Sequence, residues 1–433
     1  MPKFSLFWFR RDLRVEDNVG LYKALQSGHP VIPIFIFDEN ILSKLPKQDR
    51  RLELIINALG RVNDAMKRNR CTVRTYHSTP KAIFSELIEE YDIAEVYANR
   101  DYEPYGCKRD AEIETLLAKH KIAFHTYKDQ VIFHENEVVK DDGLPYKVYT
   151  PYSRKWLARW KQEGPEFAPS EVHLDALHPS ENKMHSLEDL GFTASGHPNP
   201  SYTLTNTLID HYEATRNFPA LDQTSRLGPQ LRFGTLSIRN LVAQAAARAN
   251  NTFLKELIWR EFFMQILWHF PHTRETSFKP QYERIPWRND EKEFEKWCRG
   301  ETGYPLVDAG MRQLNATGFM HNRVRMLVGS FLCKHLLIDW RWGEAYFAEK
   351  LLDYEMASNV GNWQWVAGCG VDAAPYFRIF NPTEQIKKFD KDLAYIQKWV
   401  PDHQELTYPQ PVVEHKMARE RCLTIYKTAL EQT

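Results

Sequence analysis

A segment that covers residues 351–382 gathers the side chains best suited to chemistry. It has the sequence LLDYEMASNVGNWQWVAGCGVDAAPYFRIFNP and combines carboxylates, amides and aromatic rings. Flat rings stack on flat ligands, and neighbouring amides or carboxylates fix the orientation of the ligand. The segment therefore indicates a site for a flat, polar ligand. On composition alone, a well-packed helical core with capped turns is the alternative.

Two further segments carry residue types that suit a nucleic-acid or nucleotide ligand. Glu256 and Trp259 are three residues apart in a helical pattern, so both point to one face of the helix. A ring that stacks and a carboxyl group that accepts hydrogen bonds make a recognition pair for a pyrimidine, although an exposed glutamate beside a core tryptophan has the same pattern. Upstream, Thr224–Leu227 (TSRL) offers hydroxyls and a guanidinium to a phosphate, with an ordinary helix N-cap as the alternative.

Length and composition limit the class of protein. A chain of 433 residues is too long for one compact core, which predicts two domains or more. Its 43% hydrophobic and 26% charged residues are typical of a globular protein, and a net charge of zero speaks against strongly electrostatic DNA binding. The 6 cysteines are scattered without a CxxC pair, so we expect no metal site and a reducing, cytoplasmic setting. We find no signal peptide and no apolar run of about 18 residues, so we expect no membrane span.

Residues 1–130 alternate between strand-like and helix-like segments. The candidate strands are Phe4–Phe9, Val31–Phe37, Val73–Tyr76, Glu95–Ala98 and Ala123–Tyr127. The intervening helices predict a parallel, Rossmann-like sheet with right-handed crossovers. Arg10, Arg11, Asp12 and Arg14 follow the first strand, where such sheets bind ligands or contact another domain; a salt-bridged turn is the alternative. No GxGxxG or Walker motif is present, so a nucleotide cradle of the usual kind is not predicted.

The rest of the chain changes character twice. Residues 131–201 are predicted to be a connector. Asp141–Gly143 is a turn signal, Tyr149–Lys161 is basic and aromatic, and Gly164–Pro200 is rich in Pro, Ser, His and acidic residues, which predicts a long, poorly regular linker. From residue 202 to residue 433 the hydrophobic pattern is helical, without a convincing strand or internal repeat. We therefore predict an α/β N-terminal domain over residues 1–130 and an all-α C-terminal domain over residues 202–433.

These motifs resemble the photolyase/cryptochrome family, and among its members the class I cyclobutane pyrimidine dimer photolyases. The likeness extends from FWFRRDLR at Phe7–Arg14 to KFD at Lys388–Asp390, and it includes the WQW and DAAPYFRIFNP motifs. It implies an all-α FAD-binding domain and light-driven repair of cyclobutane dimers in damaged DNA. The alternatives within the family are a cryptochrome blue-light photoreceptor and a DASH-type single-strand photolyase. A non-photochemical nucleotide-binding enzyme is a further alternative, against which the missing glycine motifs count.

The resemblance implies a role for each matching residue. The FAD-binding positions are Tyr212, Thr224, Ser225, Arg226, Leu227, Arg260, Arg325, Asp353, Glu355 and Asn359. Asn359 matches the residue that faces flavin N5, and Arg325 is expected to pair with Asp353. Two positions depart from the pattern: Glu355 stands where Asp is usual, and Asn362 where Gly is more common.

The same resemblance places the lesion and the electron route. Glu256, Asn322 and Asn359 are the expected catalytic residues, and the expected lesion- or DNA-binding residues are Trp259, Asn322, Arg323, Met326, Trp365 and Arg378. Asn322 and Met326 match enzymes that split cyclobutane dimers, whereas (6-4) photolyases carry His at the first position. Trp287, Trp340 and Trp363 match the family's chain of electron-transfer tryptophans, although tryptophans are more often packing residues.

An antenna domain is implied for the N-terminal part. The motif Asp101–Gly106 (DYEPYG) resembles the version that holds a deazaflavin, and Gly106 stands where the folate-holding version usually has Glu. A deazaflavin is therefore expected rather than folate, with no antenna as a further alternative. Damaged DNA is the expected partner, and a monomer is the expected state.

Overall fold

The chain folds into two compact units, each discontinuous in sequence. The computed structural model describes residues 3–431. The first unit comprises the described residues up to Val138, together with Trp156–Tyr202 and Leu227–Ala247. The second comprises Val139–Lys155, Thr203–Arg226 and the described residues from Arg248 onward.

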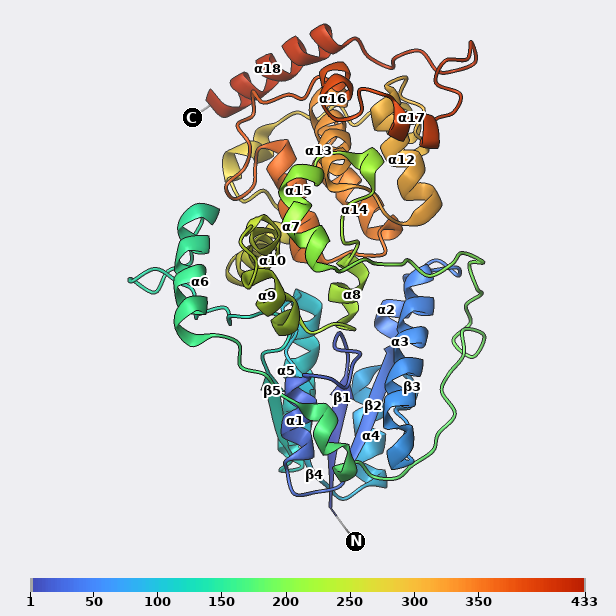
Figure 1. Ribbon diagram of the computed structural model, residues 1–433, viewed down its shortest axis with the longest axis vertical. Coiled ribbons are helices and arrows are strands. Elements are labelled where there is room, and N and C mark those ends of the chain that lie inside the picture. Colours follow the sequence, from blue (N-terminus) through green and yellow to red (C-terminus); the bar gives the residue numbers. More distant parts are fainter. Residues whose placement is uncertain (1–2, 432–433) are drawn as a thin grey trace. The chain divides into compact units, whose positions relative to one another are not determined.

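The first unit is an α/β unit built on a five-stranded parallel sheet in the order β3-β2-β1-β4-β5 (Figure 1). Its strands are β1 (Phe4–Phe9), β2 (Val31–Asp38), β3 (Arg74–Ser78), β4 (Ile93–Asn99) and β5 (Ala123–Tyr127). Its helices are α1 (Val19–Leu25), α2 (Glu39–Leu42), α3 (Arg50–Met66), η1 (Lys67–Asn69), α4 (Pro80–Glu90), α5 (Pro104–Lys119), η2 (Ser170–Ala176), α8 (Gly228–Phe233) and α9 (Ile238–Ala246). The predicted parallel sheet is thus confirmed.

The alternation of residues along β1 explains the layers. Phe7 and Phe9 point to one face of the sheet and share a core with α1 and α3, whereas Leu6 and Trp8 point to the other and pack with α4 and α5. Every residue of β2 is buried, as expected for a strand with helices on both faces.

The turn after β1 forms a salt-bridged network. Arg14 binds both carboxylate oxygens of Asp129, at 2.8 and 2.9 Å, and Arg11 binds Glu103 at 3.0 Å. Asp12 is buried nearby; burial, followed by the charge of Asp129, raises the pKa of Asp12 to about 6. The basic motif after the first strand therefore stabilises the α/β unit, which agrees with the structural alternative for these residues.

Residues 227–247 are helical but belong to the α/β unit, so the compact units do not follow the continuous domain boundaries that the sequence suggested. Arg239 on α9 pairs with Asp17 and with Asp129, both at 2.8 Å, and all three side chains are buried. Arg232 at the end of α8 pairs with Glu103 at 2.6 Å. A buried charge left without its partner is costly, so these ion pairs tie α8 and α9 to the strand ends.

The second unit is all-helical, as predicted. Its helices are α7 (Asn206–Thr215), η3 (Pro219–Leu221), α10 (Thr252–His269), η4 (Pro271–Arg274), η5 (Pro280–Arg284), α11 (Glu291–Arg299), α12 (Pro305–Thr317), α13 (Asn322–Ser330), the π-helical η6 (Phe331–Leu336), α14 (Trp340–Lys350), α15 (Met356–Ala367), α16 (Pro382–Phe389), α17 (Ala394–Trp399) and α18 (His415–Glu431). The predicted connector contains a long helix, α6 (Tyr149–Glu163), over its basic, aromatic part.

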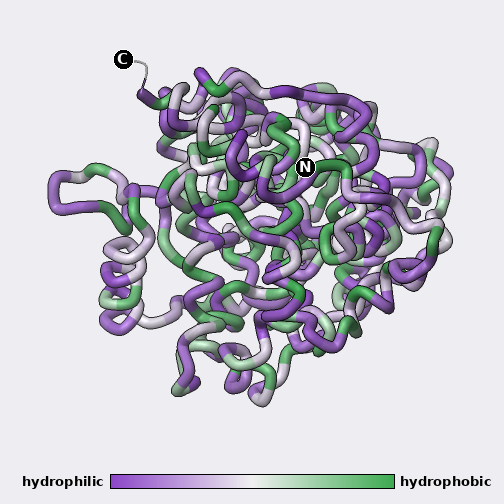
Figure 2. The backbone as a smooth tube through the Cα atoms, turned by 90° about the horizontal axis from the view of Figure 1, so that it is seen from above, coloured by the Kyte–Doolittle hydropathy of each residue, from purple (hydrophilic) through white to green (hydrophobic). Residues whose placement is uncertain are grey.

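The core of the helical unit forms around α12, α13, η6 and α15, with Trp297, Phe331 and Trp340 among its fully buried side chains. Gly361 on α15 lets that helix approach α10, because a Cβ atom there would lie 2.2 Å from the ring of Phe263. Hydrophobic and hydrophilic stretches alternate along the chain (Figure 2), and within residues 3–431 we find no helix with the length and apolar character needed to cross a membrane.

Candidate functional site

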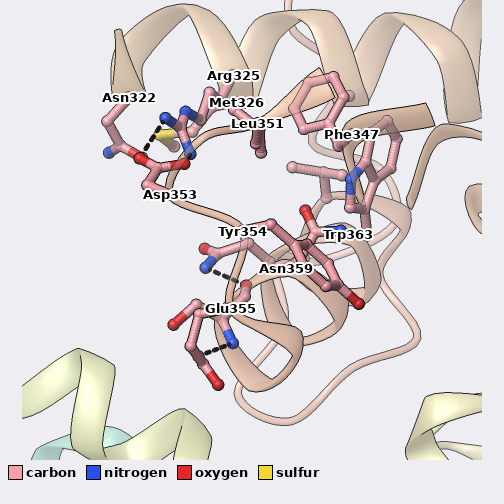
Figure 3. A pocket seen from close by; sticks show the side chains of 14 residues that line it. Asn322, Arg325, Met326, Phe347, Leu351, Asp353, Tyr354, Glu355, Asn359 and Trp363 are labelled. Atoms are coloured by element: carbon pink, nitrogen blue, oxygen red, sulfur yellow. Dashed lines mark hydrogen bonds and ion pairs between the residues drawn. The ribbon is translucent and has the colours of Figure 1, made fainter. Parts of the chain in front are cut away.

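A pocket in the helical unit brings together the residues at the centre of the sequence prediction. It has a volume of about 100 Å³ and lies among α13, α14, α15 and the turn before α15. Figure 3 shows the side chains converging from these elements. The lining residues are Asn322, Arg325, Met326, Gly329, Phe347, Leu351, Asp353, Tyr354, Glu355, Ser358, Asn359, Asn362, Trp363 and Val366.

One wall is the first turn of α13. His321 caps this helix, because its Nδ1 accepts a hydrogen bond from the backbone N–H of Arg323 at 3.2 Å. Asn322 is the first helical residue and is exposed, and Met326 lies one turn further on and faces the same pocket. Burial, and then the charges of nearby arginines, lowers the pKa of His321 to about 4. The capping histidine is therefore neutral near pH 7 and can accept the bond.

Arg325 and Asp353 form the expected ion pair at the edge of the pocket. Their two hydrogen bonds measure 3.2 and 2.8 Å, in the parallel arrangement that suits a guanidinium and a carboxylate. Arg325 also donates to the carbonyl oxygen of Met320 at 2.7 Å. The pair thereby joins α13 to the turn before α15.

The carboxylate of Glu355 caps α15. Its two oxygens accept hydrogen bonds from the N–H groups of Ala357 at 3.1 Å and Ser358 at 2.8 Å. A carboxylate at this position is also favoured by the helix dipole. Glu355, which stands where the family usually has Asp, thus has a local structural role as the cap of α15. The other departure, Asn362, donates to the Ser358 carbonyl at 2.8 Å and remains exposed.

Asn359 is held by Glu344, a residue that the sequence did not single out. The amide nitrogen of Asn359 donates to the Glu344 carboxylate at 2.9 Å and to the Glu344 carbonyl oxygen at 3.1 Å. With its nitrogen engaged, the side chain of Asn359 has its carbonyl oxygen left for the pocket (Figure 3). Burial raises the pKa of Glu344 above its ordinary value, despite the opposing hydrogen bonds from Asn359 and Tyr354.

Trp363 forms the inner wall of the pocket. It is 3% exposed, and its ring contacts Phe347 at 5.0 Å and Trp297 at 6.1 Å between centroids. Of the other two predicted electron-transfer residues, Trp340 is buried, and Trp287 is half-buried with its ring 6.0 Å from that of Tyr426. Trp297 was not predicted from the sequence, because nothing local distinguishes it from other core tryptophans.

Glu256 and Trp259 lie outside this pocket, on α10. Glu256 forms an ion pair at 2.5 Å with Arg216, the residue that follows α7. Trp259 is stacked on Tyr149, with centroids 3.7 Å apart and the planes inclined by 6°. Arg260 is half-buried next to Trp259 on the same helix, and Trp365 is half-buried on α15. One face of Trp259 is thus already occupied by a protein ring, which the sequence did not reveal.

Three arginines of the helical unit form an electropositive group. Arg323 donates to the side chain of Asn217 at 2.5 Å and lies over the ring of Phe389. Burial lowers the pKa of Arg323, and the positive charges of Arg216 and Arg378 lower it further. Arg216 already has the carboxylate of Glu256 as its partner, so Arg323 and Arg378 are the guanidiniums of this group that suit a phosphate. Arg216 was missed in the sequence because it stands outside the TSRL motif.

The TSRL segment has the features of a phosphate-binding turn. Thr224 has a buried hydroxyl that meets no hydrogen-bond partner within residues 3–431. Arg226 has a positive φ of 55°, pairs with Asp222 at 2.6 Å and lies over the ring of Phe319. Ser225 is half-buried, and the side chain of Leu227 is buried, so only the backbone of Leu227 is suited to a polar ligand.

Tyr212 lies on α7. Its ring makes an edge contact with Phe253, and the guanidinium of Arg216 lies 5.3 Å from its centroid. The TSRL segment and the pocket each offer groups that fit FAD. The orphaned Thr224 hydroxyl is a donor for a pyrophosphate, and the pocket lined by Asn359, the Arg325–Asp353 pair and Trp363 offers polar groups and an aromatic wall to a flat ring. The fold and site thus define a class: an α/β unit with an all-helical unit whose polar, aromatic pocket suits a flavin.

Family models agree with this class. A model described as DNA photolyase matches residues 5–171, and one described as the FAD binding domain of DNA photolyase matches residues 253–407. Proteins named deoxyribodipyrimidine photo-lyase are similar along nearly their whole length. The protein from Vibrio cholerae is 36% identical over 98% of this chain and 99% of the relative, and the protein from Escherichia coli is 34% identical over 98% of both.

Solved structures give the same result. A class III photolyase from Agrobacterium tumefaciens has a TM-score of 0.86 and 33% identity, covering 99% of this chain and 98% of that one. An archaeal photolyase from Sulfolobus tokodaii with two FAD molecules has a TM-score of 0.84 and 31% identity, covering 98% and 100%. A cryptochrome from Synechocystis has a TM-score of 0.84 and 26% identity, covering 98% and 99%. The chain belongs to the DNA photolyase family, and its helical unit contains the family's FAD-binding domain.

Proposed function

We propose that this protein is a deoxyribodipyrimidine photo-lyase that repairs cyclobutane pyrimidine dimers in DNA. The observation that carries the proposal is the shared pocket of Asn322 and Met326 with Asp353 and Asn359. In this pocket a residue with no titratable proton, Asn322, lies beside the groups suited to the flavin. Splitting a cyclobutane ring requires no proton delivered to a leaving group, whereas (6-4) repair does, so an amide here favours the first reaction.

FAD is bound, in this proposal, by the TSRL turn and the pocket. Thr224, Ser225 and Arg226, with the backbone of Leu227, contact the pyrophosphate, and Tyr212 and Arg260 flank that region. Arg325, Asp353, Glu355 and Asn359 surround the flat ring. When bound and reduced, FAD supplies the light-excited electron that opens the dimer. Glu344 orients Asn359, and the buried wall of Trp363 and Phe347 excludes water from the ring.

The DNA is held, in the same proposal, by Arg323 and Arg378. These guanidiniums bind backbone phosphates and carry no sequence information. Glu256, Trp259 and Trp365 contact the dimer itself, which leaves the duplex more readily than a normal base because its pairing is already disrupted. Trp287, Trp340 and Trp363 conduct electrons from the surface to the flavin.

The antenna, oligomeric state and location complete the proposal. A Cβ atom at Gly106 would lie 2.5 Å from the Asp101 carboxyl carbon, so the side chain expected of a folate-holding motif does not fit here. This supports a deazaflavin-type antenna, if the α/β unit carries one. We further propose that the protein acts as a monomer in the cytoplasm, where six free cysteines, four of them buried, stay reduced.

The test uses the purified full chain. Its absorption spectrum should show a flavin, and the chemically reduced protein should convert a cyclobutane thymine dimer in a defined oligonucleotide under near-ultraviolet or blue light but not in the dark. Repair of (6-4) photoproducts alone would refute the assignment of the lesion. Bound FAD with no repair of either lesion, on duplex or single-stranded DNA, would favour a cryptochrome-type photoreceptor, and repair restricted to single strands would favour a DASH-type enzyme.

A further inference from the structure

Tyr149, the first residue of α6, forms an aromatic stack with Trp259 on α10. Its ring lies 3.7 Å from that of Trp259 and nearly parallel to it, at 6°. Phe262 and Phe263 contact the same indole from α10 itself, at 5.6 and 5.5 Å between centroids. The indole is therefore supported both by its own helix and by a residue more than one hundred positions away in the chain.

Two hydrogen bonds fix Tyr149 in this position. Its hydroxyl donates to the carbonyl oxygen of Lys255 at 2.8 Å, one turn before Trp259 on α10. Its backbone N–H donates to a carboxylate oxygen of Asp372 at 3.1 Å. Asp372 adopts a φ of 46°, the left-handed region that non-glycine residues seldom occupy. Tyr149 thus connects α10 with the loop that follows α15.

The chemistry of the phenol suits a fixed support. Burial, and then the charge of Glu256, raises the pKa of Tyr149, so the hydroxyl stays protonated and remains a donor to Lys255. Glu256 itself is paired with Arg216 and is not a hydrogen-bond partner of the phenol. The tyrosine therefore touches the turn that carries Glu256 and Trp259 without competing for the carboxylate.

We propose that Tyr149 is a positioning residue for lesion recognition, which stacks on one face of Trp259 and fixes the orientation in which the indole meets a flipped-out pyrimidine. The inference rests on the proposed function, because it assigns the orientation of a ring in the proposed lesion site. Without the stack, the half-buried indole would sample other side-chain orientations, and ordering it again would reduce the free energy gained when the dimer binds. Tyr149 contacts the lesion only through Trp259 in this scheme.

The experiment compares variants of the full chain by the ratio of their dissociation constants for undamaged and dimer-containing duplexes. Tyr149→Ala should lower this ratio by about threefold to tenfold, the equivalent of one aromatic pair, while FAD content and affinity for undamaged DNA stay unchanged. Tyr149→Phe keeps the ring and should retain the ratio within about twofold. Tyr146→Ala is the matched control, because Tyr146 lies on the same segment but packs against Tyr152.

A double-mutant cycle separates positioning from general stability. Trp259→Ala and Tyr149→Ala should not be additive: once the indole is removed, loss of Tyr149 should have no further effect on the ratio. Additive effects, or an unchanged ratio in Tyr149→Ala, would overturn the inference. If the alanine variant does not fold, Tyr149→Leu fills the volume without stacking and should show the same loss. A wild-type protein without preference for the dimer would refute the proposed function itself, before any variant is compared.

Discussion

Asn359 donates its side-chain amide to the carboxylate of Glu344 at 2.9 Å, and this bond fixes the pocket-facing group of α15 against α14. Replacing Glu344 by Ala removes this charged acceptor and leaves the amide only the backbone carbonyl oxygen of residue 344, to which it also donates at 3.1 Å. Because a hydrogen bond to a charged group contributes about 1.5–3 kcal/mol, we expect Glu344→Ala to lower the free energy of unfolding by that amount, and Glu344→Gln by less. Urea denaturation of the wild type and the two variants measures the free energy of unfolding. Glu349→Ala, an exposed change on the same helix, should stay within about 0.5 kcal/mol.

The Arg325–Asp353 pair gives a second prediction, which concerns the geometry of the guanidinium. Arg325→Lys keeps the positive charge but loses the two parallel bonds to Asp353 and the bond to Met320. We expect the variant to retain less FAD through gel filtration than the wild type, by about tenfold in dissociation constant. Lys350→Arg on α14 is a control for the same substitution class at a surface site. If Arg325→Lys binds FAD as tightly as the wild type, the Arg325–Asp353 pair does not contribute to the cofactor site.

The sequence predicted the fold well because its patterns are local. The short apolar runs at Phe4–Phe9 and Val31–Phe37, with helix-like segments between the candidate strands, predicted the parallel sheet with nearly the observed bounds. The assignment of α8 and α9 to the α/β unit could not be predicted, because it depends on Arg239 pairing with Asp17 and Asp129, contacts that no periodic pattern encodes.

In the candidate site, too, the motif residues were predicted from the sequence and their long-range partners were not. Arg325 with Asp353, and Asn322 with Met326, were expected from motif positions, and the structure places all four in one pocket. The partners Glu344, Arg216 and Tyr149 were missed, because each acts on a motif residue from a distant, ordinary-looking part of the sequence. Long-range contacts of single side chains leave no signature in composition or spacing.

Electron transfer to the flavin is predicted to pass through Trp363. Trp363→Phe should abolish light-driven reduction of the oxidised flavin, while the chemically reduced variant still repairs dimers at close to the wild-type rate. Trp340→Phe and Trp287→Phe should each slow photoreduction if the electron follows the predicted route. Because the ring of Trp297 contacts that of Trp363, Trp297→Phe tests whether Trp297 takes part in electron transfer. If photoreduction is unchanged in Trp340→Phe but lost in Trp297→Phe, the electron reaches Trp363 through Trp297 and not through Trp340.

Acid is predicted to destabilise the helical unit through two buried histidines. Burial lowers the pKa of His335 to about 3 and that of His321 to about 4, both below the ordinary value of 6.5. Between these values and pH 6.5 the unfolded chain binds more protons than the folded one, so stability falls as the pH falls. Each histidine contributes up to about 1.4 kcal/mol per pH unit in that window.

Thermal unfolding between pH 7 and pH 4.5 measures the predicted loss of stability in acid. His335 donates to or accepts from His415 at 2.8 Å, with Lys334 and Arg421 nearby, so no carboxylate among its described contacts offsets an added proton. His335→Gln should flatten the dependence of stability on pH, whereas His197→Gln, at an exposed site, should leave it unchanged. An equally steep dependence in His335→Gln would assign the acid sensitivity to other groups.

Substitutions on α10 are predicted to change the recognition and repair of the dimer. Trp259→Ala should weaken binding of dimer-containing DNA by about tenfold to a hundredfold, since a stacked base contributes about 1–3 kcal/mol, and should barely change binding of undamaged DNA. Glu256→Ala removes a negative charge that is paired with Arg216 and should lower repair per absorbed photon more than affinity.

Asn322 tests the chemistry of the pocket directly. Asn322→His introduces a titratable group beside Met326 at the first turn of α13, where His321 already caps the helix. We expect the yield of cyclobutane repair to fall, because the amide that contacts the dimer is lost and a proton donor is of no use to ring opening. Asn322→Gln should retain more activity than Asn322→His, since it keeps the amide. Repair yields measured with pre-reduced protein, under the same light dose, decide the order; a histidine variant at least as active as the glutamine variant would contradict the role given to the amide.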